Sequence, residues 1–387
     1  MDETYIDYQS AKPVDYRVVD AMLPYFTERF GNPASLHSVG DRANDVLEAS
    51  RAAVASFVGA KPEEILFTSG ATESNNLAIM GFATRAKRTG SHVIISEMEH
   101  ISLHNIAKQL EKSGFTVSMI PPDQYGRISP EKLRNRLTDQ TVLVSIGWAN
   151  NEIGTVQNVS ALAEVLKGSG AAFHVDAVAA EGLVPIDVSA VPVDLLTLSG
   201  NDIYGPPGIG ALYRRTGVRI APVMAGGGQE QGIRSGTENL PGVVGMAAAA
   251  TIAGNEMSAD SARIAAMRDR LVEAVLGTIP DSHLNGHPTE RLPNNAHFRF
   301  DGIEGESLLL LMRDEGIAVS TGSACSSKTL EPSHALISCG LLHEEAHGSL
   351  EFTFGRFSEE SHVDRVMEVL PGIVDRLRRM SPLYSTR

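Results

Sequence analysis

Short apolar segments alternate with amphipathic helical patterns along the first two thirds of the chain. Helical patterns such as LHNIAKQLEKSG and SALAEVLKGSG separate most of the apolar segments, and residues 41–58 place apolar side chains at helical spacing. Buried strands are predicted at EEILFTSG, HVIISEMEH, TVSMIPP, TVLVSIGWANNEIG, AAFHVDAV and VDLLTLSG. This alternation predicts βαβ units and an α/β fold with a mainly parallel sheet.

The pattern changes after about residue 258. Two segments, AHFRF and SLEFTFGRF, alternate apolar and polar residues between helical patterns, and the helix VDRVMEVLPGIVDRLRRM closes the chain. Strands that alternate in this way have one face in water, which is typical of a smaller α+β domain. We therefore predict a large α/β domain over residues 14–258 and a small α+β domain built from residues 1–13 and 259–387.

Composition narrows the function classes. The 387 residues carry a net charge of −14, which argues against a nucleic-acid-binding protein, because such a protein needs a basic face. No apolar run approaches the roughly 18–20 residues of a membrane span. The N-terminus shows no secretory pattern, so we expect a cytoplasmic protein. With only two cysteines, a disulfide framework is not expected.

Polar residues follow several predicted strands at their carboxyl ends. The segment SGATESNN, residues 69–76, begins a helix whose free N–H groups suit an anion, although a simple N-cap turn explains it equally well. His100, Asp176 and the pair Asn150–Asn151 also follow strands; alone, they are equally consistent with a surface histidine, a helix cap and a turn. Together they suit a phosphorylated aromatic cofactor lying across the strand ends.

The two cysteines differ in their neighbours. Cys325 lies in VSTGSACSSKT, and small polar neighbours indicate an exposed loop where a thiol acts as a nucleophile or a metal ligand. Cys339 lies in HALISCGLL, which is typical of a buried and inert cysteine. The segment HEEAH contains His343 and His347 at helical spacing and matches a zinc-protease motif with Glu344 as base, but Gly348 and a predicted strand follow at once, so this hypothesis ranks last.

The order of motifs closely resembles that of NifS/IscS-type cysteine desulfurases, which are fold-type I enzymes that use pyridoxal 5′-phosphate (PLP). The resemblance runs nearly end to end, through YIDYQSAKPVD, FGNPASLHSVG, FTSGATESNNLAI, SEMEH, NNEIGTVQ, HVDA, GGGQEQGIRSGTEN, LNGHP, EGESLLL, STGSACSS, LEPSHAL and FGRFS. It implies a fold-type I PLP-dependent transferase fold, a homodimer and a PLP cofactor.

The resemblance also assigns the phosphate end of the cofactor site. It implies that Ala71, Thr72 and Ser199 hold the PLP phosphate. Thr237, in GIRSGTEN, is implied to reach the phosphate bound by the partner subunit, and this is why a homodimer is expected.

The ring and the substrate have their own implied partners. His100 is implied to stack on the pyridine ring, and Asp176 to pair with the ring nitrogen. Asn151 is implied to lie near the cofactor O3′ and the substrate, and Arg356 to clamp the substrate carboxylate. Cys325 is implied to be the nucleophile that accepts sulfur as a persulfide.

Four positions depart from the family pattern. The family has SGHK where this chain has SGND, so Asn201 replaces a histidine and Asp202 replaces the lysine that forms the Schiff base with PLP. Ala179 replaces a glutamine, and Lys12 stands where the family commonly has threonine. A carboxylate cannot form an imine. Lys12 either pairs with Asp202 or lies on the surface, and a further alternative is that PLP binds non-covalently.

These departures leave two main hypotheses. In the first, normal PLP catalysis is lost, and the chain pairs with a U-type iron–sulfur scaffold protein, to which Cys325 is offered as a ligand of a shared [2Fe–2S] cluster or as a sulfur carrier. Sulfur then comes from free sulfide. In the alternative, the chain is an active cysteine desulfurase that uses non-covalent PLP with Lys12 or another base.

Overall fold

A computed structural model of the chain describes residues 3–87, 89–322, 332–382 and 384. Its centre is a seven-stranded sheet with the order β2-β8-β7-β6-β5-β3-β4, in which β8 alone runs antiparallel to its neighbours. The strands are β2 (Ile65–Thr68), β3 (His92–Ser96), β4 (Thr116–Ile120), β5 (Thr141–Ser145), β6 (Ala172–Asp176), β7 (Leu195–Ser199) and β8 (Gly210–Arg214). The predicted α/β fold with a mainly parallel sheet is confirmed.

Helices cover both faces of this sheet, because successive side chains of each buried strand point to opposite sides. Val93 and Ile95 pack with α4 and α5, whereas Ile94 between them belongs to the core on the other face. The helices of the large domain are α1 (Tyr16–Met22), α2 (Pro24–Thr27), α3 (Ser38–Phe57), η1 (Pro62–Glu64), α4 (Ala71–Ala86), α5 (Ile101–Lys112), α6 (Pro130–Arg136), α7 (Val159–Leu166), η2 (Asn201–Ile203) and α8 (Gln229–Ile233).

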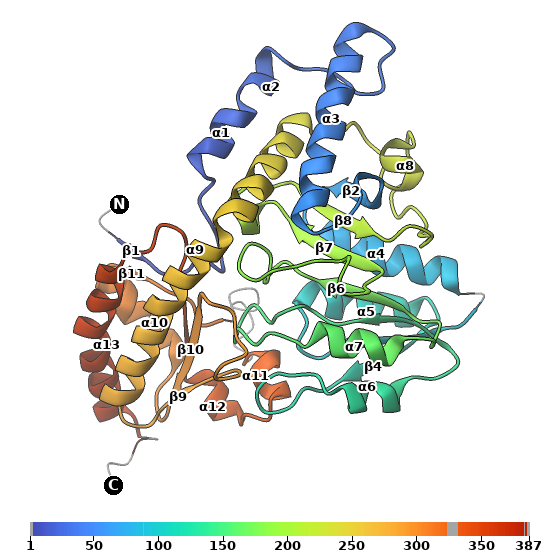
Figure 1. Cartoon of the computed structure of the whole chain (residues 1–387). Helices are drawn as coiled ribbons and strands as arrows, with labels where there is room; N and C mark the ends of the chain where they lie inside the picture. The colour runs from blue at the N-terminus through green and yellow to red at the C-terminus, as the bar shows by residue number, and fades with distance from the viewer. Residues whose placement is uncertain (1–2, 88, 323–331, 383, 385–387) are drawn as a thin grey trace.

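The long helix α9 (Leu240–Thr278) joins the two parts of the molecule, as Figure 1 shows. Its first half, up to Ala253, packs in the core of the large sheet, and its second half, from Ile264, packs in a second core. The predicted boundary at residue 258 therefore falls inside one continuous helix.

The second core belongs to a small α+β unit. Phe298, Phe300, Phe352 and Phe354 fill it. Around it lie the antiparallel strands β9 (Ser282–Leu284), β10 (Asn295–Phe300) and β12 (Ser349–Thr353), the parallel pair β1 (Thr4–Tyr5) and β11 (Ile317–Ala318), and the helices α10 (Gly305–Asp314), α11 (His334–Ser338), α12 (His343–His347) and α13 (Glu360–Met380).

The expectation that β10 and β12 have one face in water is wrong. His297 on β10 and Glu351 and Thr353 on β12 are buried, although their spacing marks them as the polar face of these strands. The reason is that this face turns toward the large domain, where Asn295 Nδ2 donates to the main-chain oxygen of Glu152 at 2.7 Å. The polar alternation therefore marks a contact between the two parts of the chain.

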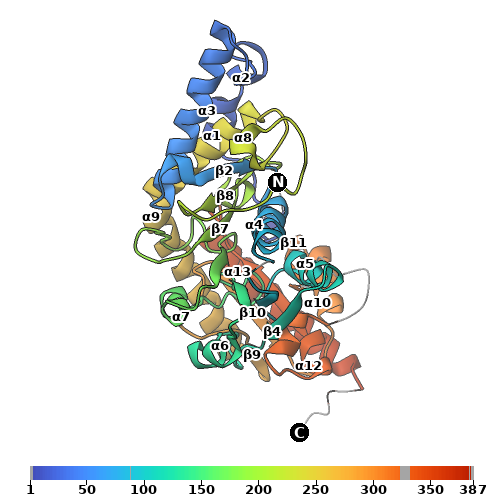
Figure 2. The same ribbon diagram turned by 90° about the vertical axis from the view of Figure 1, so that its right-hand side faces the viewer.

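Figures 1 and 2 show α1, α2 and the start of α3 at one end of the molecule, beyond the large sheet. Across the described residues, no helix combines the length and the apolar character needed to cross a bilayer.

Candidate functional site

A cavity of about 370 Å³ lies at the carboxyl ends of β3, β5, β6 and β7, where open α/β sheets bind their ligands. The small unit contributes Ser320, Gly322 and Glu351 to its wall. Five residues that were expected to hold a cofactor line it together: Ala71, Thr72, His100, Asn151 and Asp176. Three of the altered positions also line it: Ala179, Asn201 and Asp202.

Asp176 is held rigidly at the end of β6. Its Oδ2 accepts a hydrogen bond from Asn75 Nδ2 at 2.7 Å, and its Oδ1 accepts one from the Val178 amide at 3.0 Å. Burial raises the pKa of Asp176. Nearby, His100 caps α5, since its Nδ1 accepts from the Ser102 amide. A carboxylate and an imidazole ring thus share one wall of the cavity.

The structure brings together only some of the residues that were expected to hold the cofactor phosphate. Ala71 and Thr72 begin the 16-residue helix α4, so their N–H groups are free of helix partners and suit an anion. Gly210 lets β8 approach this turn, because a Cβ there would lie 2.7 Å from Gly70 Cα. Ser199 is buried outside the cavity lining, and its amide donates to Glu181. Thr237 lies exposed in the loop before α9; its implied role toward a partner subunit stays a prediction.

Lys12 and Asp202 form an ion pair, as one interpretation of the sequence predicted. Lys12 Nζ donates to the Asp202 main-chain oxygen at 2.6 Å and lies 3.6 Å from Asp202 Oδ1. The Lys12 side chain is only 4% exposed, so the alternative that it lies on the surface is wrong. Among the described residues, no lysine or arginine lines the cavity.

Four carboxyl groups line the same cavity, and two of them were missed from the sequence. Glu99 follows β3, and its Oε1 accepts from the Gly147 amide at 2.8 Å; burial raises its pKa to about 8. Glu351 projects from β12, and its Oε1 accepts from Asn295 Nδ2 at 3.0 Å; burial, with Glu152 nearby, raises its pKa. Asp176 and Asp202 are the other two. The acidic residue in the alternating strand SLEFTF was the available signal for Glu351.

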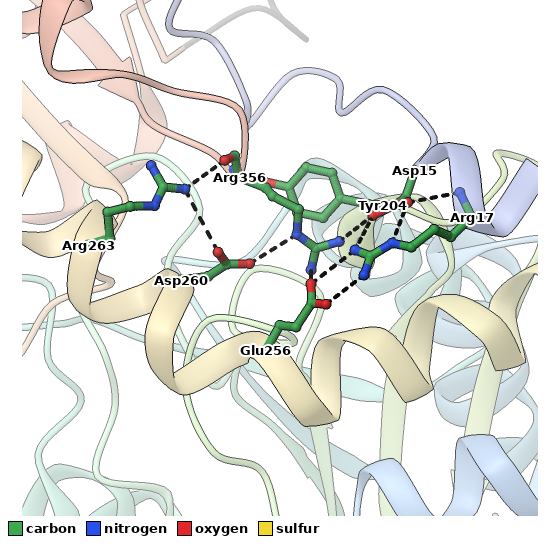
Figure 3. A network of polar contacts seen from close by, with 7 residues as sticks. All are labelled: Asp15, Arg17, Tyr204, Glu256, Asp260, Arg263 and Arg356. Atoms are coloured by element: carbon green, nitrogen blue, oxygen red, sulfur yellow. Dashed lines mark hydrogen bonds and ion pairs between the residues drawn. The ribbon is translucent and has the colours of Figure 1, made fainter.

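Arg356 is not at the cavity, which contradicts its expected position. Its guanidinium lies between Asp15 and Asp260 (Figure 3). The ion-pair distances are 2.8 Å to Asp15 and 2.9 Å to Asp260, and Glu256 Oε2 is 3.8 Å away. The guanidinium also stacks on the ring of Tyr204, 4.6 Å from its centroid. Three carboxylates already satisfy this cation, and this is the physical reason that it does not reach the cavity.

Cys325 lies outside the described residues. Gly322, three positions earlier in the sequence, lines the cavity. Cys339 is buried, and burial raises the pKa of its thiol to about 12, as expected for an inert cysteine. His343 and His347 share a face of α12 with ring centroids 4.8 Å apart, yet the described residues contain no group of three or more metal-ligand side chains.

These residues fit PLP only in part. His100, Asp176 and the start of α4 suit a ring and a phosphate. Asp202, however, lines the cavity at the position that carries the Schiff-base lysine in the family, and a carboxylate there can neither attach an aldehyde nor favour a dianionic phosphate. Ala179 supplies no hydrogen bond to the cofactor hydroxyl. The site as built does not fit covalently attached PLP.

Glu99 gives the folded protein a measurable dependence on pH. Its pKa is about 8 when folded and near 4.5 when unfolded, so between these values the folded state holds a proton that the unfolded state has lost. Stability therefore falls as pH rises through this window, by about 1.4 kcal/mol per pH unit for one such proton. We expect wild type to lose about 2 kcal/mol relative to Glu99→Gln between pH 6 and 7.5, as measured by urea unfolding. The other titrating groups are common to both proteins. If the free energies of unfolding of wild type and Glu99→Gln changed with pH in parallel, the raised pKa of Glu99 would be contradicted.

Comparisons of the sequence and the fold with known proteins identify the family to which the chain is related. Residues 4–366 match the aminotransferase class-V family. The chain is 53% identical over 380 residues to "Cysteine desulfurase IscS 1" of Archaeoglobus fulgidus, covering 98% of this chain and 99% of that protein. It is 49% identical over 379 residues to "Cysteine desulfurase IscS" of Methanosarcina thermophila, covering 98% and 94%. Among solved structures, a NifS-like protein aligns with a TM-score of 0.91 at 34% identity, over 97% of this chain and all of the other.

Proposed function

The chain belongs to the aminotransferase class-V family and is similar to cysteine desulfurases of the IscS type, and from this premise we propose that it is a cytoplasmic IscS-like protein of iron–sulfur cluster assembly in which normal PLP catalysis is lost. It pairs with a U-type scaffold protein, and Cys325 is its contribution to the cluster, as a ligand of a shared [2Fe–2S] centre or as a sulfur carrier.

The observation that carries this proposal is the Lys12–Asp202 pair. A buried ion pair stands at the position from which the family's lysine reaches the cofactor. The amine of Lys12 donates to the Asp202 main-chain oxygen and lies outside the cavity lining, so it is not placed to attack an aldehyde in the cavity. The carboxyl-lined cavity also offers no cation to the carboxylate of an amino-acid substrate among its described residues.

The chemistry of Cys325 does not depend on PLP. Thiolates are the preferred ligands of iron–sulfur clusters, and a cluster needs several of them. One cysteine cannot build such a site, so a scaffold protein supplies the remaining ligands. Free sulfide then supplies the sulfur of the cluster directly, and no persulfide on Cys325 is formed from it.

A homodimer is part of the proposal, and an exposed apolar surface supports it. Large apolar side chains between the start of α1 and the start of α3 are exposed to solvent: Tyr16, Leu23, Phe26, Phe30 and Leu36. Several exposed large apolar side chains within one short stretch of chain are consistent with a protein interface. The surface lies at the free end of the molecule, where α1, α2 and α3 begin (Figures 1 and 2).

Cluster retention tests the role of Cys325. The full-length protein is mixed anaerobically with a U-type scaffold, ferric iron and sulfide, and the complex is isolated by size exclusion. We expect wild type to retain a [2Fe–2S] absorbance spectrum with the scaffold, and Cys325→Ser to lose most of it, because a hydroxyl is a poor ligand for this cluster. Cys339→Ser is the matched control, since Cys339 is buried away from solvent. A cluster unchanged by Cys325→Ser would contradict the proposal.

The second candidate function is an active cysteine desulfurase that uses non-covalent PLP. The observation in its favour is that His100, Asp176 and the start of α4 still line one cavity. It differs from the first candidate in one product, alanine, which only the active enzyme forms from L-cysteine.

A further inference from the structure

A second cavity lies where the two parts of the chain meet, and it shares no lining residue with the cavity at the sheet edge. Gln124, Tyr125 and Ile153 line it from the large domain, and residues in or next to β9, β10, α11 and α12 line it from the small unit. We call it the inter-unit cavity. Its volume of about 370 Å³ is within the range of small-molecule sites, which often lie where two domains meet.

One cation in the wall of the inter-unit cavity has no charged partner. Arg299 projects from β10 on the same face as Asn295 and His297. Its Nη1 donates to Asn285 Oδ1 at 3.3 Å, and it forms no ion pair among the described residues. Its Nε is buried and has no acceptor in the same set of residues. A buried donor without an acceptor is costly, so a ligand that brings acceptors to Arg299 is favoured.

The neighbouring amide does not supply a counter-charge. Asn285 is 4% exposed, and its Nδ2 lies 2.9 Å from Nδ1 of His297. Burial lowers the pKa of His297 to about 3, so this ring is neutral. Because the Asn285 oxygen faces the Arg299 cation, its Nδ2 donates to the ring, and both ends of the amide are engaged. Asn285 therefore fixes the position of Arg299 but leaves its charge unbalanced.

The carboxylate in the wall of the inter-unit cavity is engaged on its own helix. Glu345 is the acidic residue among the described lining residues, and its Oε2 accepts from the Leu342 amide at 2.7 Å, which caps α12. An unpaired guanidinium suits a carboxylate ligand, because a planar carboxylate accepts from two guanidinium nitrogens at once. Four further side chains give the cavity an apolar surface that suits an apolar body on this ligand: Ile153, Leu284, Leu336 and Leu341.

We propose that the inter-unit cavity binds a small carboxylic acid with an apolar body, and that Arg299 holds its carboxylate. The proposal goes beyond the function above and gives the chain a second ligand site; it does not depend on Cys325, on Asp202 or on a cofactor. Both parts of the chain line the cavity, so a bound acid stabilises the arrangement in which they meet. It is a statement about binding, and no reaction is attached to it.

Three small compounds test the proposal. Phenylacetate has a carboxylate and an apolar ring, phenylacetamide has the same shape without the charge, and acetate has the charge without the ring. Ligand-observed NMR titration of the full-length protein is expected to give at least about tenfold tighter binding for phenylacetate than for the other two, since each of them lacks one of the two contacts. Phenylacetate is also expected to raise the urea midpoint of unfolding, because it binds the folded state alone.

Arg299→Gln removes the charge and keeps a long polar side chain. We expect it to weaken phenylacetate binding at least about tenfold and to abolish the shift of the urea midpoint, because a charge-assisted hydrogen bond is lost. Arg365→Gln is the matched control, since Arg365 belongs to the same unit but pairs with Glu315 and Glu368 on the surface; it is expected to keep the wild-type affinity. Circular dichroism verifies that each variant is folded.

Glu345→Gln supplies an independent test that leaves Arg299 in place. Glutamine keeps an oxygen that caps α12, but the negative charge is removed from the cavity wall. Phenylacetate is therefore expected to bind about twofold tighter, whereas binding of the neutral phenylacetamide is expected to stay the same.

Four outcomes would overturn the proposal: no binding of phenylacetate, either comparison compound binding as tightly, an affinity that survives Arg299→Gln, or an affinity for phenylacetate that Glu345→Gln does not raise. The last of these decides the matter if Arg299→Gln does not fold. These measurements use neither a scaffold protein nor iron. Failure here therefore leaves the proposed role of Cys325 standing, and failure of cluster retention leaves this proposal standing.

Discussion

Wild-type protein is expected to release no alanine from L-cysteine above the level of a protein-free control, even with excess PLP and a reductant under anaerobic conditions. The reason is that position 202 holds a carboxylate, which cannot bond covalently to the cofactor or move protons as an amine does. Alanine is the appropriate product to measure, because it reports the carbon skeleton of cysteine and is not confused by contaminating sulfide.

The informative variant restores the amine. Asp202→Lys alone would place a second ammonium next to Lys12, so it is combined with Lys12→Thr, which installs the residue that the family commonly has there. We expect this double variant to bind PLP in a form that borohydride makes permanent. We also expect it to release alanine about a hundredfold faster than wild type, the scale on which positioned acid–base groups act.

Controls separate the two candidate functions. Lys12→Thr alone keeps Asp202 and is expected to stay inactive. Many turnovers of alanine per protomer by wild type, abolished by Cys325→Ala, would contradict the leading proposal and favour non-covalent PLP. A double variant that binds PLP covalently but stays inactive would point to the missing receptor for the substrate carboxylate, since Glu351 rather than a cation faces the cavity from β12.

The sheet was predictable because its signals are local. Apolar runs separated by helical patterns give βαβ units, and polar residues directly after strands then gather at one edge of the sheet. His100, Asn151 and Asp176 could be placed in one cavity for this reason. The resemblance singled out positions 12 and 202, and opposite charge made their ion pair one of the alternatives, which the structure then shows.

The small unit was harder to predict, because its polar residues act over long range in sequence. Alternation along SLEFTFGRF indicates a face in water, but it does not reveal that the large domain covers that face. Glu351 and Arg356 are five residues apart, and only the fold decides which of them meets the cavity. Resemblance placed Arg356 there; the structure puts Glu351 there and engages Arg356 elsewhere.

Arg356 is therefore expected to matter for stability. Its side chain is 10% exposed and binds Asp15, which is 1% exposed, and Asp260 on α9. The main chain of its own loop is held as well: the Arg356 amide donates to Tyr204 Oη at 2.6 Å, and Arg263 donates to the carbonyl oxygens of Arg356 and Ser358. The network in Figure 3 thus joins the loop before α13 to α9 and to the start of α1.

Removing this guanidinium takes one partner from the buried Asp15 and one from Asp260, which is 24% exposed; loss of the whole partner of a buried charge costs about 3–5 kcal/mol. Since Arg17 continues to bind Asp15 and Glu256, we expect Arg356→Ala to lower the free energy of unfolding by about 3 kcal/mol, the lower end of that range. Urea unfolding measures the change. Arg365→Ala is the matched control, because Arg365 pairs with the exposed Glu315 and Glu368 on the surface, where such pairs contribute less than about 1 kcal/mol.

A structural role and a substrate-clamping role predict different patterns for the same variant. If Arg356 holds the two parts of the chain together, Arg356→Ala lowers stability and leaves any binding of L-cysteine unchanged in the protein that remains folded. Arg356→Lys should fall between wild type and alanine, since an ammonium keeps the charge but cannot reach Asp15 and Asp260 with two separate nitrogens. If instead stability is unchanged and L-cysteine binding is lost, Arg356 leaves its carboxylates for the substrate, and the network in Figure 3 belongs to the ligand-free state alone.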